Sequence, residues 1–108
     1  MGFLNLEERA AKEPFPGAAM RTFWGDKMLV SRVDFGPGVV VPDHSHPHEQ
    51  VGVLLSGELT LTIDGEQRTL RAGDMYIVPG GAIHGGVAGD EGFTAFEVFS
   101  PVREEYKY

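Results

Sequence analysis

The residues best suited to chemistry in this chain are histidines. His44 and His46 are two positions apart, and His84 follows later in the 108-residue sequence. Side chains two apart on an extended strand point to one face, so we expect the first two imidazoles to converge. A third imidazole from a later strand would complete a group that suits a divalent transition metal. Cysteine is absent, which excludes thiolate ligands and disulfides.

Gln50 is the fourth candidate ligand, through its amide oxygen. It lies in an otherwise apolar stretch, where a buried amide without a partner would cost about 1–3 kcal/mol. A metal ion is one such partner, and a hydrogen bond within the core is the alternative. His48 and Glu49 are rival ligands. Glu49 has the opposite strand parity and should face away, whereas His48 should be exposed or support a ligand.

The spacing around these residues resembles the cupin superfamily. The first motif covers residues 38–57, with fixed positions at Gly38, His44, His46, Gln50 and Gly57. The second covers residues 73–88, with fixed positions at Gly73, Pro79, Gly81 and His84. Two positions depart from the usual pattern, since cupins more often have Glu as fourth ligand and Asn where this chain has Ala88. The resemblance implies a small β-barrel that holds one divalent metal near its mouth through His44, His46, Gln50 and His84.

A third group of polar residues follows the last predicted strand, in Glu97-Val98-Phe99-Ser100-Pro101-Val102-Arg103. Glu97 and Phe99 share a face of that strand, where a charge needs a partner or a function. Arg103 lies beyond the Ser-Pro turn and could return to the mouth of the barrel to bind a carboxylate through two hydrogen bonds. A solvated glutamate on an edge strand and a surface arginine are the alternative.

A narrower resemblance combines the run His-Ser-His-Pro-His-Glu-Gln with the later Glu-x-Phe-Ser-Pro-x-Arg. It is similar to the small cupins of pectin and alginate breakdown, which convert 4,5-unsaturated uronates to open-chain keto forms. The acidic position is more typically Asp in that group. The resemblance implies that Glu97 acts in acid–base chemistry, Phe99 lines the pocket and Arg103 binds the substrate carboxylate. It also implies a homodimer.

The proposed ligand set limits the chemistry. Three imidazoles and one carboxamide leave the double charge of the ion uncompensated, so the site should attract anions and act mainly as a Lewis acid. Two histidines and a carboxylate would instead suit non-haem iron and oxygen chemistry. The first hypothesis is a metal-dependent isomerase or lyase-type enzyme acting on a small sugar acid. A dioxygenase of a small organic acid and a non-catalytic metal-binding protein are the alternatives, and the ion is left open among zinc, nickel, iron, manganese and copper.

Short strands must position these residues. Alternating apolar residues and glycine- or proline-rich breaks predict strands at 18–24, 27–35, 50–55, 58–64, 66–70, 75–78 and 93–99. We expect turns at Gly57 and at 89–92, a hairpin at Asp64-Gly65, and a short helix capped by Asn5. With the resemblance above, the pattern predicts an all-β, single-domain antiparallel barrel over residues 1–108, the cupin jelly roll. Residues 1–17 would form an N-terminal arm.

Composition and charge limit the partners and the location. A net charge of −7 argues against nucleic acid and anionic membranes as partners. The expected partner is a small anionic substrate, which the uncompensated charge of the metal would attract. No apolar run approaches the ~18 residues of a membrane span, and the first residues lack the pattern of a signal peptide, so we expect a cytoplasmic protein. The segment 51–55 is apolar on both faces, so a second layer or a partner subunit should cover it.

Overall fold

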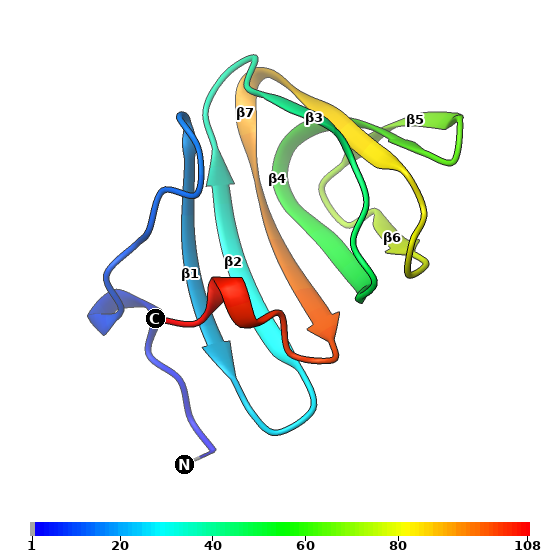
Figure 1. The fold of residues 1–108 in the computed structure, drawn as a ribbon. Coiled ribbons are helices and arrows are strands. Elements are labelled where there is room, and N and C mark those ends of the chain that lie inside the picture. Colours follow the sequence, from blue (N-terminus) through cyan, green and yellow to red (C-terminus); the bar gives the residue numbers. More distant parts are fainter. Residues whose placement is uncertain (1) are drawn as a thin grey trace.

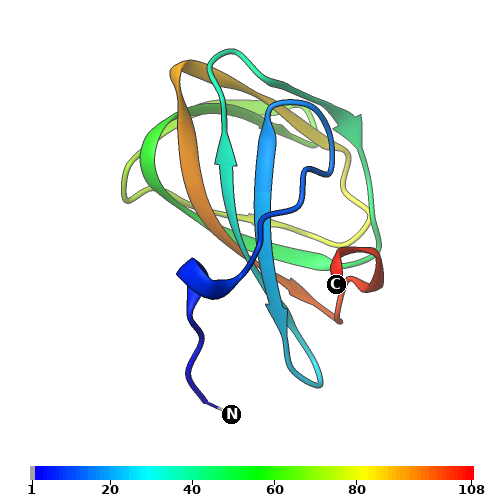
Figure 2. The same cartoon turned by 90° about the vertical axis from the view of Figure 1, so that its left-hand side faces the viewer.

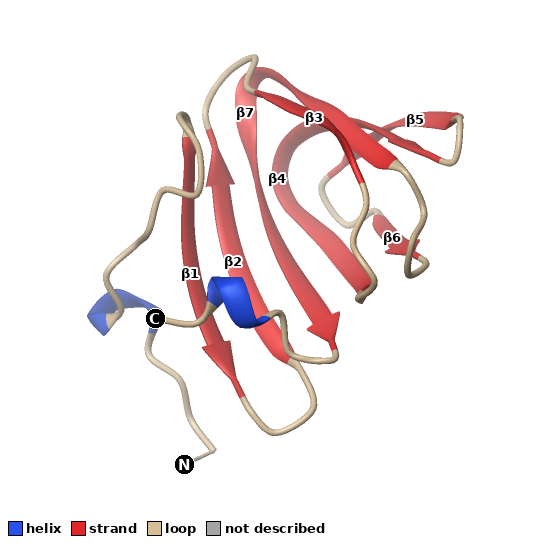
Figure 3. Cartoon of the chain, in the orientation of Figure 1, coloured by secondary structure: helices blue, strands red, loops and turns tan. Residues whose placement is uncertain are grey.

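The computed structural model describes residues 2–108, which form one antiparallel sheet of seven strands (Figures 1 and 3). Two 3-10 helices, η1 (Leu6–Glu8) and η2 (Glu104–Tyr106), flank the strands. The predicted all-β fold with little helix is confirmed. The strands are β1 (Ala18–Trp24), β2 (Leu29–Phe35), β3 (Val40–His44), β4 (Glu49–Ile63), β5 (Glu66–Arg71), β6 (Met75–Val78) and β7 (His84–Ser100).

The two longest strands, β4 and β7, form the spine of the sheet. The strand order is β1-β2-β7-β4-β5, with β3 pairing to β7 and β6 pairing to β4. Figures 1 and 2 show the sheet curling round on itself, with β3 and β6 on the opposite side from β1 and β2. Within residues 2–108 the hydrogen-bonded strands do not close into a ring, so the jelly roll is an open barrel.

Both spine strands bend where the sequence predicted turns, so the predicted chain reversals at Gly57 and 89–92 are wrong. The first half of β4 pairs with the last half of β7, and the second half of β4 pairs with the start of β7. The pairing register shifts on both sides of Gly57, which has a φ of 78°. A Cβ there would overlap the carbonyl oxygen of Gly92. Glycine therefore lets both strands bend at one place while their backbones stay in contact.

Two local predictions have different outcomes. The hairpin at Asp64-Gly65 is present, and both residues have the positive φ angles, 47° and 82°, that a type I′ turn requires. The N-terminal helix is only η1, although Asn5 caps it by accepting a hydrogen bond from the Glu7 amide. Extended pairing of Lys12 with Met20 continues the arm toward the sheet and ends helical structure early.

The hydrophobic core lies on the inner face of the curl. β1 and β2 alternate buried and half-buried residues along their length, as expected for a half-covered sheet. Leu54, Leu59, Phe93 and Ala95 contribute from the two spine strands and are buried. None of the helices formed by residues 2–108 has the length and apolar character needed to cross a lipid bilayer.

Candidate metal centre and binding cavity

The three candidate histidines come together where the end of β3 lies beside the start of β7. His44, the last residue of β3, pairs with His84, the first residue of β7, and their ring centroids are 4.3 Å apart. His46 lies two residues beyond the end of β3, so the first two histidines do not share one strand as expected. Its ring centroid nevertheless lies 4.8 Å from that of His84, and one ligand nitrogen from each ring lies within 4.8 Å of the others.

Glycines allow the backbones around the histidines to approach closely. The Gly81 amide donates to the His46 carbonyl over 2.8 Å, and a Cβ on Gly80 would overlap the Pro47 carbonyl. The turn after β6 therefore rests directly on the loop that carries His46. Next to His84, a Cβ on Gly85 would overlap the Asp43 side chain, so this glycine brings β3 against β7. The second motif thus positions the histidines of the first.

Each of the three rings is oriented by a backbone carbonyl two residues away, which lies 2.9–3.0 Å from its Nδ1 atom. A carbonyl can only accept, so each Nδ1 carries the proton and donates it. The Nε2 atoms of His44, His46 and His84 then keep their lone pairs. Fixing one ring nitrogen so that the other can bind is the usual support of metal-binding histidines.

Burial also favours the neutral form of two of the histidines. It lowers the pKa of His46 and that of His84 below the ordinary 6.5, and the positive charge of Arg103 lowers both further. Near neutral pH these two rings are therefore unprotonated, which is the form that a metal ion requires.

The polar atoms beside the three rings are arranged as a cation site would need. The buried Nε2 atom of His84 has no hydrogen-bond partner in the described chain. The Nε2 atom of His46 lies 3.0 Å from Oε1 of Gln50, so a nitrogen lone pair faces an amide oxygen. Such facing acceptors are unfavourable alone, and a cation between them and the other rings satisfies them all. The residues present therefore fit a divalent metal ion.

The neighbours of Gln50 are arranged as the strand parity predicts. Gln50 is buried on the inner face of β4, whereas Glu49 is exposed on the other face. His48 supports His46 through its backbone carbonyl rather than through its ring. The amide nitrogen of Gln50 donates to Oε2 of Glu97 over 2.5 Å, which leaves its oxygen turned toward His46.

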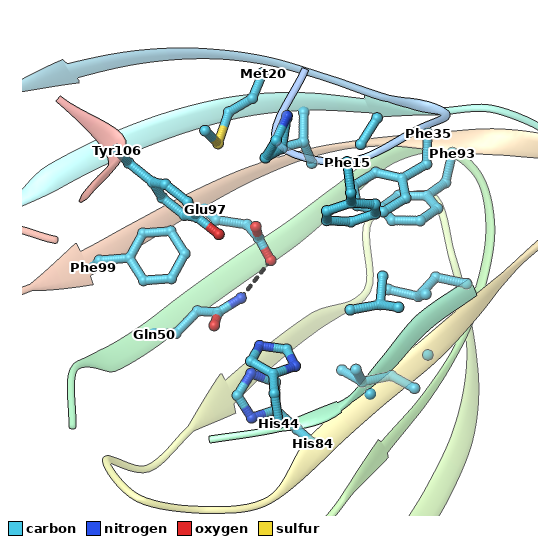
Figure 4. A pocket seen from close by; sticks show the side chains of 18 of the residues that line it. Phe15, Met20, Phe35, His44, Gln50, His84, Phe93, Glu97, Phe99 and Tyr106 are labelled. Atoms are coloured by element: carbon cyan, nitrogen blue, oxygen red, sulfur yellow. Dashed lines mark hydrogen bonds between the residues drawn. The ribbon is translucent and has the colours of Figure 1, made fainter. Parts of the chain in front are cut away.

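A cavity of about 100 Å³ opens beside the histidines (Figure 4). His44, His84 and Gln50 line one side of it. An aromatic group lines another side and includes Phe35 and Phe93, whose rings stack with centroids 4.5 Å apart. The cavity therefore combines polar groups near the histidines with an apolar remainder, as small-molecule sites commonly do.

The three late residues predicted from the sequence all line this cavity: Glu97, Phe99 and Arg103. Burial raises the pKa of Glu97 above its ordinary 4.5. The Arg103 guanidinium carbon lies 4.2 Å from the ring centroid of Tyr106 and 5.1 Å from that of Phe99, and its Nε donates to Glu105 over 3.0 Å. The arginine thus lies against two aromatic rings, and its side chain is only 11% exposed.

Two tyrosines of the site were missed by sequence analysis. Tyr76 donates a hydrogen bond to Oε2 of Glu97 over 2.5 Å, and Tyr106 packs against Arg103. Burial raises the pKa of both phenols, that of Tyr76 to well above 10. The one sequence feature related to Tyr76 is Gly52, two residues from Gln50, whose missing side chain leaves room for the tyrosine ring. This feature can be interpreted only once the pairing register of β6 with β4 is known.

Comparison with known proteins places the chain in a family. A model described as "Cupin domain" matches residues 31–99. The chain belongs to the cupin family. This cupin is 32% identical over 84 residues to the pectin degradation protein KdgF of Dickeya dadantii (strain 3937), a match that covers 77% of this chain and 76% of that protein.

Other curated relatives match a shorter part of this cupin. Dimethylsulfoniopropionate lyase DddW of Ruegeria pomeroyi is 40% identical over 65 residues, which is 60% of this chain and 43% of the lyase. Oxalate oxidase GF-2.8 of Triticum aestivum is 36% identical over 64 residues, which is 51% of this chain and 29% of the oxidase.

Solved structures match the whole fold of this cupin. KdgF from Halomonas sp. superimposes with a TM-score of 0.92 at 27% identity and covers 99% of both chains. An RmlC-like cupin from Shewanella frigidimarina NCIMB 400 also gives a TM-score of 0.92 at 27% identity, covering 99% of this chain and 96% of the other.

Proposed function

We propose that this cupin is a metal-dependent enzyme of the isomerase or lyase type that acts on a small sugar acid such as a 4,5-unsaturated uronate. The observation that carries the proposal is that Glu97 and Arg103 line the same cavity as His44 and His84. One cavity thus offers a proton-transferring group, a carboxylate-binding group and a place for a metal. The similarity to a protein named for pectin degradation supports a sugar acid as the substrate.

In this proposal the metal is held by the Nε2 atoms of His44, His46 and His84 and by Oε1 of Gln50. When bound, the ion supplies Lewis-acid polarisation of a substrate oxygen. All four ligands are neutral, so the site keeps a positive charge that favours an anionic substrate. The ligand set suits zinc, nickel, iron, copper or manganese.

Arg103 binds the substrate carboxylate in this scheme. Its Nε is occupied by Glu105, and its guanidinium is kept in place by the rings of Tyr106 and Phe99. The remaining N–H groups form the fork that matches a carboxylate. Phe99 also provides an apolar surface on which the substrate can rest beside the metal.

Glu97 moves the proton. Its Oε2 atom already accepts from both Tyr76 and Gln50, so Oε1 is the atom left for the substrate. Opening an unsaturated uronate ring and converting its enol to a ketone removes a proton from a hydroxyl and adds one to carbon, with no net oxidation. Burial raises the pKa of the Glu97 carboxyl above its ordinary value, which favours the protonated form that can deliver a proton to carbon.

Turnover of unsaturated uronates tests the proposal. Monomeric 4,5-unsaturated uronates, released from pectin or alginate by lyases, should lose the ultraviolet absorbance of their conjugated double bond when the metal-loaded protein is added. The chelator-treated protein should lose this activity and regain it with metal, and a saturated uronate should not react. No acceleration by any metal-loaded preparation would refute the proposed reaction.

An oxidoreductase of a small organic acid is the second candidate, and the similarity to oxalate oxidase favours it. The neutral Gln50 argues against it, because oxygen chemistry at non-haem iron usually involves a carboxylate ligand. Oxygen uptake in stoichiometric proportion to an organic acid consumed by the iron-loaded protein would replace the isomerase proposal with this one.

We also propose that residues 1–108 act as one cupin domain that pairs with a second copy in the cytoplasm. The outer face of the sheet supports the pairing, and we define it by Val51, Val53, Met75, Ile77, Phe96 and Val98, which lie opposite one another on β4, β6 and β7. Met75 is 69% exposed and Ile77 is 60% exposed, and no segment of residues 2–108 covers them. An apolar face of this kind is typical of a protein–protein interface.

A further inference from the structure

Three side chains next to the histidines, those of Tyr76, Glu97 and Gln50, are linked by hydrogen bonds. Tyr76 Oη donates to Oε2 of Glu97, and the amide nitrogen of Gln50 donates to the same oxygen, each over 2.5 Å. The opposite end of the amide, Oε1, lies 3.0 Å from Nε2 of His46. The orientation of the candidate ligand Gln50 is therefore tied to groups on two other strands, β6 and β7.

The backbone makes this arrangement possible through a single glycine. Tyr76 lies opposite Gly52 on β4, and Gly52 lies opposite Glu97 on β7. A Cβ on Gly52 would overlap the end of the Tyr76 ring, so the ring crosses β4 over this residue to reach the carboxylate. Gly52 is buried, and Tyr76 is only 9% exposed. The contact is thus a feature built across three neighbouring strands.

The donor and the acceptor of each hydrogen bond in this series can be assigned. The Tyr76 phenol, whose pKa burial raises well above 10, is protonated near neutral pH and donates its proton to Oε2 of Glu97. That oxygen also receives the NH₂ group of Gln50, as Figure 4 shows. An amide has one donor end and one acceptor end, so holding the NH₂ group here turns the oxygen toward the histidines. Glutamate at position 50 would need no hydrogen bond to orient it in this way, because both of its oxygens can bind a metal.

We propose that Tyr76 and Glu97 are positioning residues for the Gln50 ligand, with Gly52 as the gap that lets Tyr76 reach the carboxylate. Glu97 then has two separate tasks, because Oε2 orients the ligand and Oε1 faces the substrate. This inference rests on the metal-binding part of the proposed function and is independent of the uronate chemistry.

Metal affinity of paired variants tests the inference. Zn²⁺ affinity, measured by competition with a chromophoric chelator, should fall about tenfold or more in Glu97→Leu, as expected when a group that orients a ligand is removed. Glu97→Gln should keep the affinity within about threefold, because its amide oxygen still accepts from Tyr76 and Gln50. The absorption spectrum of bound Co²⁺ should change in Glu97→Leu and stay unchanged in Glu97→Gln.

The hydrogen bond from Tyr76 to Glu97 is tested by its own variants and control. Tyr76→Phe and Gly52→Ala should both weaken Zn²⁺ binding by about threefold to tenfold, since one loses the hydroxyl and the other displaces the ring. Tyr108→Phe is the matched control, because its hydroxyl donates to the backbone carbonyls of Ala10 and Met20 and not to Glu97 or Gln50, and it should bind as the wild type does. Thermal melting without metal identifies any variant that is unfolded.

The outcomes separate the two proposals. Wild-type protein that binds no Zn²⁺, Ni²⁺ or Co²⁺ would refute the metal site and the proposed function together. Wild-type protein that binds metal, with a folded Glu97→Leu variant of equal affinity and unchanged Co²⁺ spectrum, would refute only the positioning role. Loss of affinity in Glu97→Leu, Tyr76→Phe and Gly52→Ala, with none in the two controls, would support it even if no uronate is turned over.

Discussion

At the scale of single residues, Glu97 is where the two proposed tasks of the site meet. Replacing it with Gln keeps the hydrogen bonds to Tyr76 and Gln50 but removes the ionisable group. We expect Glu97→Gln to bind metal normally and to lose at least about 100-fold in kcat on an unsaturated uronate, the usual worth of a general acid–base. Steady-state kinetics and metal analysis of the same Glu97→Gln sample measure both quantities. Turnover at the wild-type rate would remove Glu97 from the chemistry.

The pH dependence of metal retention follows from the histidines. Burial, and then the charge of Arg103, lowers the pKa of His46, and burial lowers that of His84. Both rings therefore stay neutral, and keep the metal, until the pH falls below the ordinary 6.5. In the metal-free protein these rings contribute stability above pH 6.5 that is lost as the pH falls below it, and the loss levels off beneath their folded pKa values.

Arg103→Gln tests the electrostatic part of this argument. Removing the guanidinium removes a charge that lowers the pKa of both histidines, so His46 and His84 of the metal-free protein should take up protons at a higher pH than in the wild type. NMR titration of the imidazole C–H resonances in the metal-free protein checks it. Arg71→Gln, on exposed β5, is the control and should follow the wild-type curve. A titration of both rings in Arg103→Gln at or below the wild-type pH would contradict the electrostatic argument.

Residue spacing predicted which side chains gather here but not how they are linked. His44, His46 and His84 could be identified because the spacing of glycines and histidines survives in the linear sequence. Tyr76 and Tyr106 could not, because their partners lie on other elements. The reach of Tyr76 across Gly52 depends on the register of three strands, which no local pattern contains.

At the scale of elements, the bend of the spine strands depends on Gly57. Alanine there must adopt a positive φ, which costs about 1–2 kcal/mol, and its Cβ would also overlap the Gly92 carbonyl. Gly65 has a similar φ of 82° but open space around a Cβ, so Gly65→Ala isolates the first cost. We expect Gly57→Ala to lower Tm by about 10 °C or more and Gly65→Ala by about half of that, from thermal melting. Equal Tm values for both variants would show that the contact at Gly92 is unimportant.

The same bend explains where prediction of the strands failed. The segments 18–24 and 75–78 were predicted with their observed bounds, because alternating residues between clear breaks define them. Gly57 and residues 89–92 also look like breaks. A glycine that ends a strand and one that bends it differ only in whether the partner strand continues, and that is a non-local property.

At the scale of the whole molecule, the uncovered outer face predicts self-association. Placing a charge in an apolar interface is unfavourable, so Ile77→Glu should convert a dimer to monomer at micromolar concentration. Sedimentation velocity measures this directly. Val87→Glu is the control, because Val87 is 45% exposed but belongs to the other half of β7. A wild-type protein that is already monomeric would contradict the predicted pairing.

The metal content of purified protein tests the central claim most directly. After loading with Zn²⁺ or Ni²⁺ and removal of excess ion, elemental analysis should find about one ion per chain in the wild type. His84→Ala should retain less than about a tenth of that, because it removes the Nε2 atom that otherwise lies buried with no partner within residues 2–108. A wild type without a stoichiometric ion, or a folded His84→Ala variant with the same content, would contradict the proposed metal site.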